Sequence, residues 1–177
     1  MLTTEKKGAA APAASTGELN LGPYFIQHMI GSHYVLDVNG DGASTSEGTQ
    51  VIAYGLKPQG NSNQQWQFVP AGPETPGWWY LQTLMGTDYV MTLQPHTMIE
   101  PRPVVMLPKG LTDADSQLWS LQPTEKLGYW YIQSKYGASN AQAPLVIGLT
   151  GEQSAVASPI SFTEFEKQAW GFRPVYL

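Results

Sequence analysis

The sequence predicts an all-β domain built from three similar units, and three observations lead to this prediction. Charged residues make up only 13% of the chain, against about 25% in an average soluble domain, and its 177 residues include 18 glycines and 14 prolines. The apolar segments are four to six residues long and alternate with turn-forming residues, without a sustained helical period. Three motifs recur in the same order at intervals of 51 to 56 residues.

The most distinctive repeated motif is a Gln-x-Trp tripeptide. It occurs at residues 64–66, 117–119 and 168–170, at intervals of 53 and 51 residues. Two other motifs precede each copy. The aromatic strands expected to open the units are 24–27, 79–82 and 130–133. The apolar strands expected to follow them are 34–38, 89–93 and 145–149. The threefold recurrence predicts three copies of one structural unit.

A unit of about 50 residues with about four short strands cannot bury both of its faces alone. Three such units closed around a shared axis can do so, and closure also removes exposed sheet edges. We therefore expect Trp66, Trp119 and Trp170 to point into a common core. The glutamine of each motif is expected to bond buried main-chain groups where a strand meets a turn.

The three Gln-x-Trp motifs resemble those of the ricin B-type β-trefoil family. The resemblance covers residues 22 to 174 and implies a β-trefoil of three pseudo-equivalent four-stranded units, at about 22–72, 73–124 and 125–177. Extracellular toxin members of the family use disulfides. The chain has no cysteine, so it is more similar to the cysteine-free bacterial and fungal lectins. Residues 1–20 contain no aromatic residue, valine or isoleucine that could pack, and we expect a disordered tail before the domain at 21–177.

The resemblance also implies a sugar site in the first unit. In the family, an Asp on the second strand and an Asn directly before the Gln-x-Trp bind two sugar hydroxyls, and an aromatic residue ten positions before the Gln stacks on the sugar ring. Here these positions are Asp37, Asn63 and Tyr54, and Gly40 matches a position that offers a main-chain N–H. With Gln64 they form the expected ligand site. The family precedent implies galactose or N-acetylgalactosamine as the ligand.

Each of these residues also has a purely structural interpretation. Asp37 precedes Asn39-Gly40 and could cap a turn, Tyr54 could be an ordinary strand residue, and Asn63 could be a turn residue. Ile52, two positions before the aromatic, replaces a residue that is polar in the family.

The other two units lack the residues that the family uses for sugar binding. In the second unit the corresponding residues are Thr92, Leu107 and Ser116. In the third unit Gly148 and Lys167 replace the Asp and the Asn, and the segment from Phe162 to Gln168 is four residues shorter than that from Tyr54 to Gln64. We therefore expect one sugar site per chain.

Metal, cofactor and enzyme chemistry find little support in the sequence. The segment from Asp37 to Gly42 begins like an EF-hand calcium loop, but Gly48 stands where the bidentate Glu should be. The three histidines are scattered, and the nucleophile, phosphate-loop and zinc motifs of common enzymes are absent. We expect neither a metal nor a cofactor, and no catalysis.

Charge and hydropathy narrow the choice of partners. The net charge of −5 disfavours nucleic acid, and no segment approaches the length of a membrane span. The first residues contain no signal-peptide core, which predicts a cytoplasmic protein or one secreted by a non-classical route. Glycans are the expected partners, with a homodimer as an option. The alternative is a protein-interaction module, such as a protease inhibitor, that acts through the loops Pro70–Gly77 and Gln94–Pro103.

Overall fold

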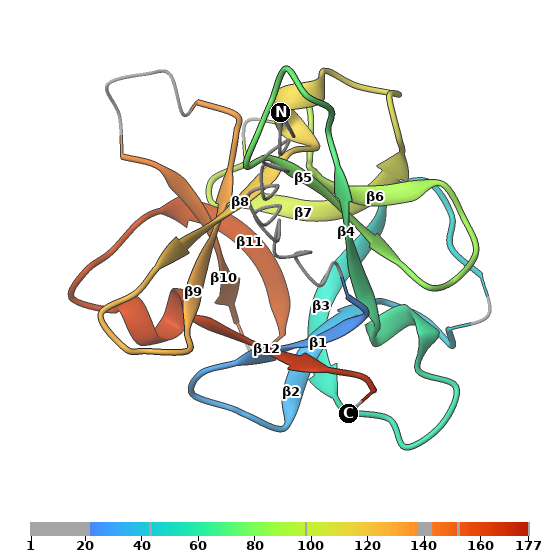
Figure 1. Ribbon diagram of the computed structural model, residues 1–177, viewed down its shortest axis with the longest axis horizontal. Coiled ribbons are helices and arrows are strands. Elements are labelled where there is room, and N and C mark those ends of the chain that lie inside the picture. Colours follow the sequence, from blue (N-terminus) through green and yellow to red (C-terminus); the bar gives the residue numbers. More distant parts are fainter. Residues whose placement is uncertain (1–21, 43, 98, 138–142, 152, 177) are drawn as a thin grey trace, which may run out of the picture.

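The computed structural model in Figure 1 describes residues 22–42, 44–97, 99–137, 143–151 and 153–176. The regular elements of these residues are twelve strands and three short 3-10 helices (η). In chain order they are β1 (Tyr24–His28), β2 (Tyr34–Val38), β3 (Thr49–Gly55), η1 (Ser62–Gln64), β4 (Trp66–Pro70), β5 (Trp79–Thr83), β6 (Tyr89–Leu93), β7 (Arg102–Pro108), η2 (Ala114–Ser116), β8 (Trp119–Pro123), β9 (Trp130–Ser134), β10 (Leu145–Thr150), β11 (Ser154–Pro159), η3 (Phe165–Gln168) and β12 (Trp170–Pro174). The all-β prediction is confirmed. The predicted tail, residues 1–20, lies outside the described residues.

Six of the strands form a closed antiparallel ring. β1 pairs with β12 and β4, β5 pairs with β4 and β8, and β9 pairs with β8 and β12. In Figure 1, β1 and β12 lie side by side, so the first and last strands complete the ring. Each strand of the ring thus has a partner on both sides, which protects its edges from pairing with other chains.

The other six strands form three hairpins, β2–β3, β6–β7 and β10–β11. The second strands of these hairpins also pair with one another, β3 with β7, β7 with β11 and β11 with β3. Figure 1 shows the hairpins spread around the centre of the molecule. The loop predicted at Gln94–Pro103 ends two residues earlier, because Arg102 and Pro103 pair with β11 and begin β7.

The core is centred on the three repeated tryptophans. Trp66, Trp119 and Trp170 have no exposed surface and belong to one cluster of buried residues, as predicted. Each indole N–H donates to a main-chain carbonyl on the first strand of a hairpin, 2.8–2.9 Å away. These bonds satisfy the one polar atom of each buried indole, so the tryptophans can be buried without leaving a donor unpaired.

The glutamine of each Gln-x-Trp motif closes the turn after a hairpin in the same way. Its Oε1 accepts a main-chain N–H seven residues earlier at 2.8–2.9 Å. Its Nε2 donates to a carbonyl nine residues earlier at 2.9–3.0 Å. The predicted role of these glutamines is confirmed, and their bonds align the three segments residue by residue.

Candidate functional site

The candidate site is organised around the carboxylate of Asp37 on β2. Only 1% of this residue is exposed, and both of its oxygens accept hydrogen bonds. Oδ1 accepts from Nδ2 of Asn63 at 2.9 Å, and Oδ2 accepts from Nε2 of Gln64 at 2.8 Å. Two amides therefore fix the orientation of the carboxylate before any ligand arrives.

Helix η1 supplies both amides, because the chain folds back against the β2–β3 hairpin at this point. Asn63 also donates to the main-chain oxygen of Val38 at 2.9 Å, and Gln64 bonds the main chain at Gly55 and Lys57. The structure thus places Asn63 and Gln64, two predicted ligand residues, behind Asp37, where both are fully buried. Their hydrogen bonds are with the protein, and both hold the carboxylate in place.

The turn after β2 needs glycine for a steric reason. Gly42 has a φ of +83°, and a Cβ there would lie 2.9 Å from the oxygen of Gly60 and 3.0 Å from Oδ1 of Asn63. Gly40, the predicted main-chain donor, has a φ of +137°, and a Cβ there would meet nothing within 4 Å. Gly42 keeps the turn close to Asn63, whereas Gly40 faces open space.

Sequence reasoning missed Lys57. Its Nζ lies 3.3 Å from Oδ1 of Asn63, 3.3 Å from the oxygen of Gly40 and 3.6 Å from Oδ2 of Asp37. The same atom lies 5.9 Å from the ring centre of Tyr54. One feature of the sequence could have indicated this residue. Lys57 is the single Lys or Arg between Lys7 and Arg102, so it is the one cation that the first unit can place beside Asp37.

Burial raises the pKa of Asp37 above its ordinary value, and the bonds from Gln64 and Asn63 together with the Lys57 ammonium oppose this rise. Asp37 is thus an acceptor in a largely water-excluded place, with the Lys57 ammonium 3.6 Å from Oδ2. Such a group forms strong charge-assisted bonds with hydroxyl donors.

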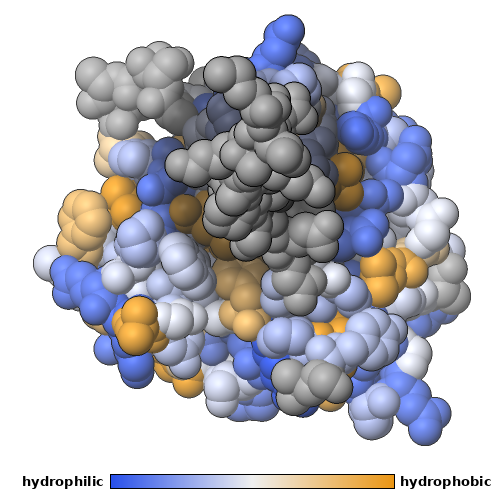
Figure 2. Space-filling model, in the orientation of Figure 1, coloured by the Kyte–Doolittle hydropathy of each residue, from blue (hydrophilic) through white to orange (hydrophobic). Residues whose placement is uncertain are grey.

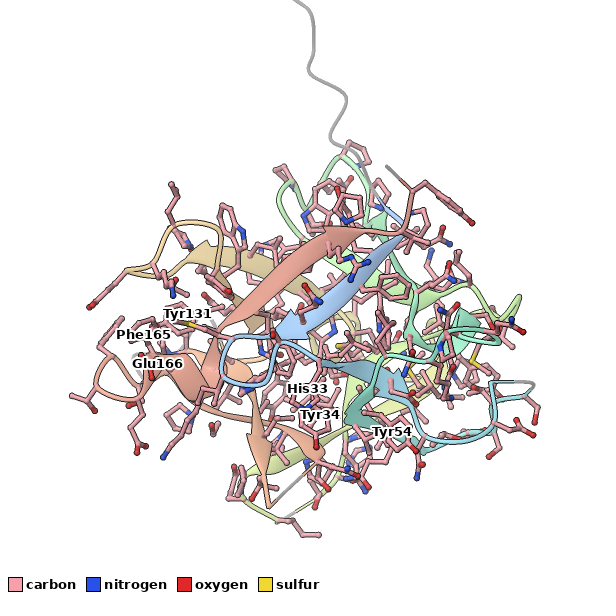
Figure 3. The ribbon with its side chains drawn as sticks, turned by 90° about the horizontal axis from the view of Figure 1, so that it is seen from below. His33, Tyr34, Tyr54, Tyr131, Phe165 and Glu166 are labelled. Atoms are coloured by element: carbon pink, nitrogen blue, oxygen red, sulfur yellow. The ribbon has the colours of Figure 1, made fainter. Side chains whose placement is uncertain are left out.

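A hollow of about 300 Å³ opens over this carboxylate. The residues that line it are Asp37, Asn39, Gly40, Ile52, Tyr54, Lys57 and Gln153. Tyr54 on β3 leaves 46% of its surface exposed and offers an aromatic wall. In Figure 3, Tyr54 lies on the same side of the molecule as His33 and Tyr34, whose rings are 4.2 Å apart.

Gln153 is the second residue that sequence reasoning missed. It lies in the turn between β10 and β11, far from Asp37 in the sequence. Its main-chain oxygen accepts from the N–H of Ala53 at 2.7 Å, and the next residue, Ser154, pairs with Ile52. The pairing of β11 with β3 therefore brings a residue of the third segment to the site of the first, which no local sequence signal indicates.

The matching place in the second segment has different chemistry. Thr92 replaces Asp37, Leu107 replaces Tyr54, and Ser116 replaces Asn63. Gln117 Nε2 donates to the Thr92 hydroxyl at 3.3 Å, so the glutamine keeps its structural bond although the carboxylate is absent.

The third segment corrects one detail of the sequence comparison. Gln168 Nε2 bonds the oxygen of Pro159, as Gln64 bonds that of Gly55, so Ser158 is the counterpart of Tyr54 and no residues are missing. Phe162, the predicted counterpart of Tyr54, lies beyond this position. Gly148 occupies the Asp position, and a Cβ there would lie 3.2 Å from Cγ of Gln168. This place therefore differs from the first site both in its side chains and in the space available for a larger residue at position 148.

The described residues contain no group of three or more His, Asp or Glu side chains that could hold a metal ion. Among the same residues, no helix is both long and apolar enough to cross a membrane. On the face shown in Figure 2, hydrophobic residues form separate patches among hydrophilic ones.

The closed ring of six strands with its three mutually paired hairpins is the arrangement of a β-trefoil, and solved structures agree. No protein-family model and no curated protein matches the sequence. The chain is similar to the designed threefold-symmetric protein ThreeFoil, with 20% identity and a TM-score of 0.68 over 86% of this chain and 98% of that one.

Two sugar-bound lectins are similar as well. The β-trefoil lectin of the Vibrio vulnificus hemolysin, solved with N-acetyl-D-lactosamine, has 17% identity and a TM-score of 0.62 over 89% of this chain and 99% of that one. The Polyporus squamosus lectin, solved with a human-type influenza-binding epitope, has 18% identity and a TM-score of 0.66 over 87% of this chain. The chain spans 49% of that lectin and 18% of a similar mosquitocidal holotoxin. At these identities the likeness shows the fold alone.

Proposed function

We propose that this protein is a carbohydrate-binding lectin without catalytic activity, and that it holds one galactose or N-acetylgalactosamine unit in the first segment. The observation that carries this proposal is a buried carboxylate, fixed by two amides, at the base of a hollow with an exposed tyrosine ring. Similar solved structures with sugars bound support it, because they use the same fold for glycan recognition. We further propose that the fold comprises three four-stranded units of the ricin B type, supported by the matching bonds of the three Gln-x-Trp motifs.

The groups of the hollow suit the two faces of a galactose ring. The C–H face would stack on Tyr54, while the adjacent 3- and 4-hydroxyls would meet Asp37. Lys57 Nζ lies 3.6 Å from Oδ2, which is too long for a direct hydrogen bond, so a hydroxyl can bridge the two groups. Gly40 would contribute its main-chain N–H.

The same arrangement is unsuited to glycoside hydrolysis. That reaction generally uses two carboxyl groups on opposite sides of the scissile bond. Asp37 is the one carboxyl group among the residues that line the hollow, and it is already bonded to Asn63 and Gln64. We therefore propose binding without turnover.

A glycan array, followed by calorimetry with a galactoside, tests this function. We expect a dissociation constant on the order of 0.1–1 mM for a monosaccharide, because a shallow site desolvates few groups. Asp37→Ala should weaken binding about 10- to 100-fold, the worth of a hydrogen bond to a charged group. Asp88→Ala, which removes an exposed carboxylate elsewhere, is the matched control.

A second variant covers the case in which the loss of Asp37 disturbs folding. Tyr54 is half exposed, so Tyr54→Ala should leave the fold intact and still abolish the stacking contribution. Galactoside binding by Asp37→Ala at the strength of the parent would refute the site. An array without any glycan signal would refute the lectin function and favour the protein-interaction alternative.

A further inference from the structure

A larger hollow lies at the place in the second segment that corresponds to the proposed sugar site. Its volume is about 600 Å³, against about 300 Å³ over Asp37. Val105 faces Thr92 across β6 and β7, as Ile52 faces Asp37 across β2 and β3. The two hollows therefore share a position in the fold but differ in every side chain that decides what they bind.

The floor of this second hollow is apolar. Val105 and Leu107 are buried in it, and Leu111 stands at its side with 55% of its surface exposed. The nearby Thr92 hydroxyl donates to the oxygen of Val90 at 2.9 Å and accepts from Gln117. The Thr92 hydroxyl, which replaces the Asp37 carboxylate, is thus already hydrogen-bonded within the protein. The floor therefore offers apolar contacts and no acceptor for a ligand hydroxyl.

The rim of the hollow carries negative charge. Glu47 and Asp113 are both exposed there, and no Lys or Arg belongs to the lining residues. Asp113 accepts the N–H of Ser116 through Oδ1 at 3.1 Å, a bond that fixes its direction and uses one of its two oxygens. With a net charge of −5 on the chain, this place attracts cations and repels anions.

The backbone at the rim is held in an uncommon conformation. His96 has a φ of +50°, and it is the one non-glycine residue with positive φ among the described residues. Non-glycine residues in this region of φ are found disproportionately at ligand sites, where the surrounding structure holds them. His96 lines the hollow next to Pro95, which fixes the entry of the chain into the turn.

We propose that the second hollow binds an organic cation with an apolar body, of the arylalkylamine class. The apolar body would lie on Val105, Leu107 and Leu111, and the ammonium group would face Glu47 and Asp113. This site is separate from the proposed sugar site in place and in chemistry, so one chain would carry two sites with different ligands.

Two-dimensional amide NMR of the whole chain, titrated with phenethylamine at neutral pH, tests this proposal. We expect shifts of the main-chain N–H groups confined to residues 47, 48, 94, 96, 105–107 and 111–113. Phenylethanol has the same shape without charge and should bind about three- to tenfold more weakly, the factor that two exposed ion pairs contribute. Phenylacetate should not shift these residues. Equal binding of the amine and the alcohol, or no shift with the amine, would overturn the proposal.

Variants separate local recognition from general attraction of cations. Glu47→Gln with Asp113→Asn removes both carboxylates, keeps an acceptor for the Ser116 N–H, and should weaken phenethylamine binding about three- to tenfold. Glu74→Gln with Glu125→Gln makes the same change in net charge at exposed positions outside the hollow, and should leave binding unchanged. An equal loss in both double variants would refute a specific site. A galactoside titration of the same sample reports on the sugar site independently.

Discussion

Asp37 shows how one residue can serve both the fold and the proposed ligand. Its bonds to Asn63 and Gln64 connect β2 to η1, which is the structural role that a turn-capping aspartate would have. The exposed Tyr54 ring and the hollow beside the carboxylate have no such structural role. The structural and the functional interpretations of Asp37 are therefore compatible, and mutation of this residue alone cannot separate them.

Measurements at different pH can separate the two interpretations. Ionisation of Asp37 lowers the stability of the fold, whereas the proposed sugar binding requires the ionised form. Burial raises the pKa of Asp37 in the folded chain, so its contribution to stability is full below the ordinary pKa and is lost as the pH rises through the raised value. Galactoside binding needs the ionised form, and we expect affinity to fall on acidification at a higher pH than an ordinary aspartate would cause.

Calorimetry from pH 7 down to about pH 4, with a thermal melt at each pH, measures both effects. The expected result is loss of galactoside affinity in samples that remain folded. An affinity that stays constant down to pH 4 would contradict the role of the Asp37 carboxylate as the acceptor for the sugar hydroxyls.

At the level of elements, the Gln-x-Trp motif joins each hairpin to the strand of the ring that follows it. The three glutamines make the same two main-chain bonds, but their third partner differs, because Gln64 bonds Asp37, Gln117 bonds Thr92 and Gln168 bonds Ser158. The structural bonds are thus common to the three segments, whereas a bond to a carboxylate exists in the first alone.

Gln64→Ala and Gln117→Ala should therefore agree in stability and differ in binding. Each removes two hydrogen bonds from partly buried main-chain groups, which should cost about 1–3 kcal/mol of the free energy of unfolding, about 0.5–1.5 kcal/mol for each bond. Galactoside binding should weaken in Gln64→Ala, because Asp37 loses its fixed orientation, and stay unchanged in Gln117→Ala. Urea denaturation and calorimetry measure the two quantities. Equal losses of binding would show that the effect passes through the fold as a whole.

The repeats made the fold of the whole molecule largely predictable from the sequence, and the site only in part. The spacing of the tryptophans placed them in the core, since a motif repeated three times has a structural cause that survives divergence of the rest. Lys57 and Gln153 could not be placed in the same way. The position of Gln153 depends on the pairing of β11 with β3, which joins residues about 100 positions apart. The sequence indicates at Gly148 only the loss of a ligand residue, whereas the structure shows that Gln168 also fills the space beside it.

The differences among the three segments predict how many sugars the whole molecule should bind. Thr92 and Gly148 cannot supply the charge-assisted acceptor that Asp37 provides, and such bonds are about twice as strong as neutral ones. Leu107 and Ser158 provide no aromatic face. A monosaccharide bound at 0.1–1 mM has a binding free energy of only about 4–5.5 kcal/mol, so a place that lacks both groups should not bind measurably.

Calorimetric titration with a galactoside should therefore give close to one site per chain, and a value near two or three would show that other groups in the second and third segments bind sugar.

One weak site cannot cross-link cells, because avidity requires at least two linked sites. A monomer should accordingly fail to agglutinate galactose-bearing cells, whereas a homodimer should agglutinate them. Sedimentation of the same preparation decides which case applies. Agglutination by a chain that sediments as a monomer with one calorimetric site would contradict this account, since the second contact with the cell surface would then have to come from somewhere other than the site over Asp37.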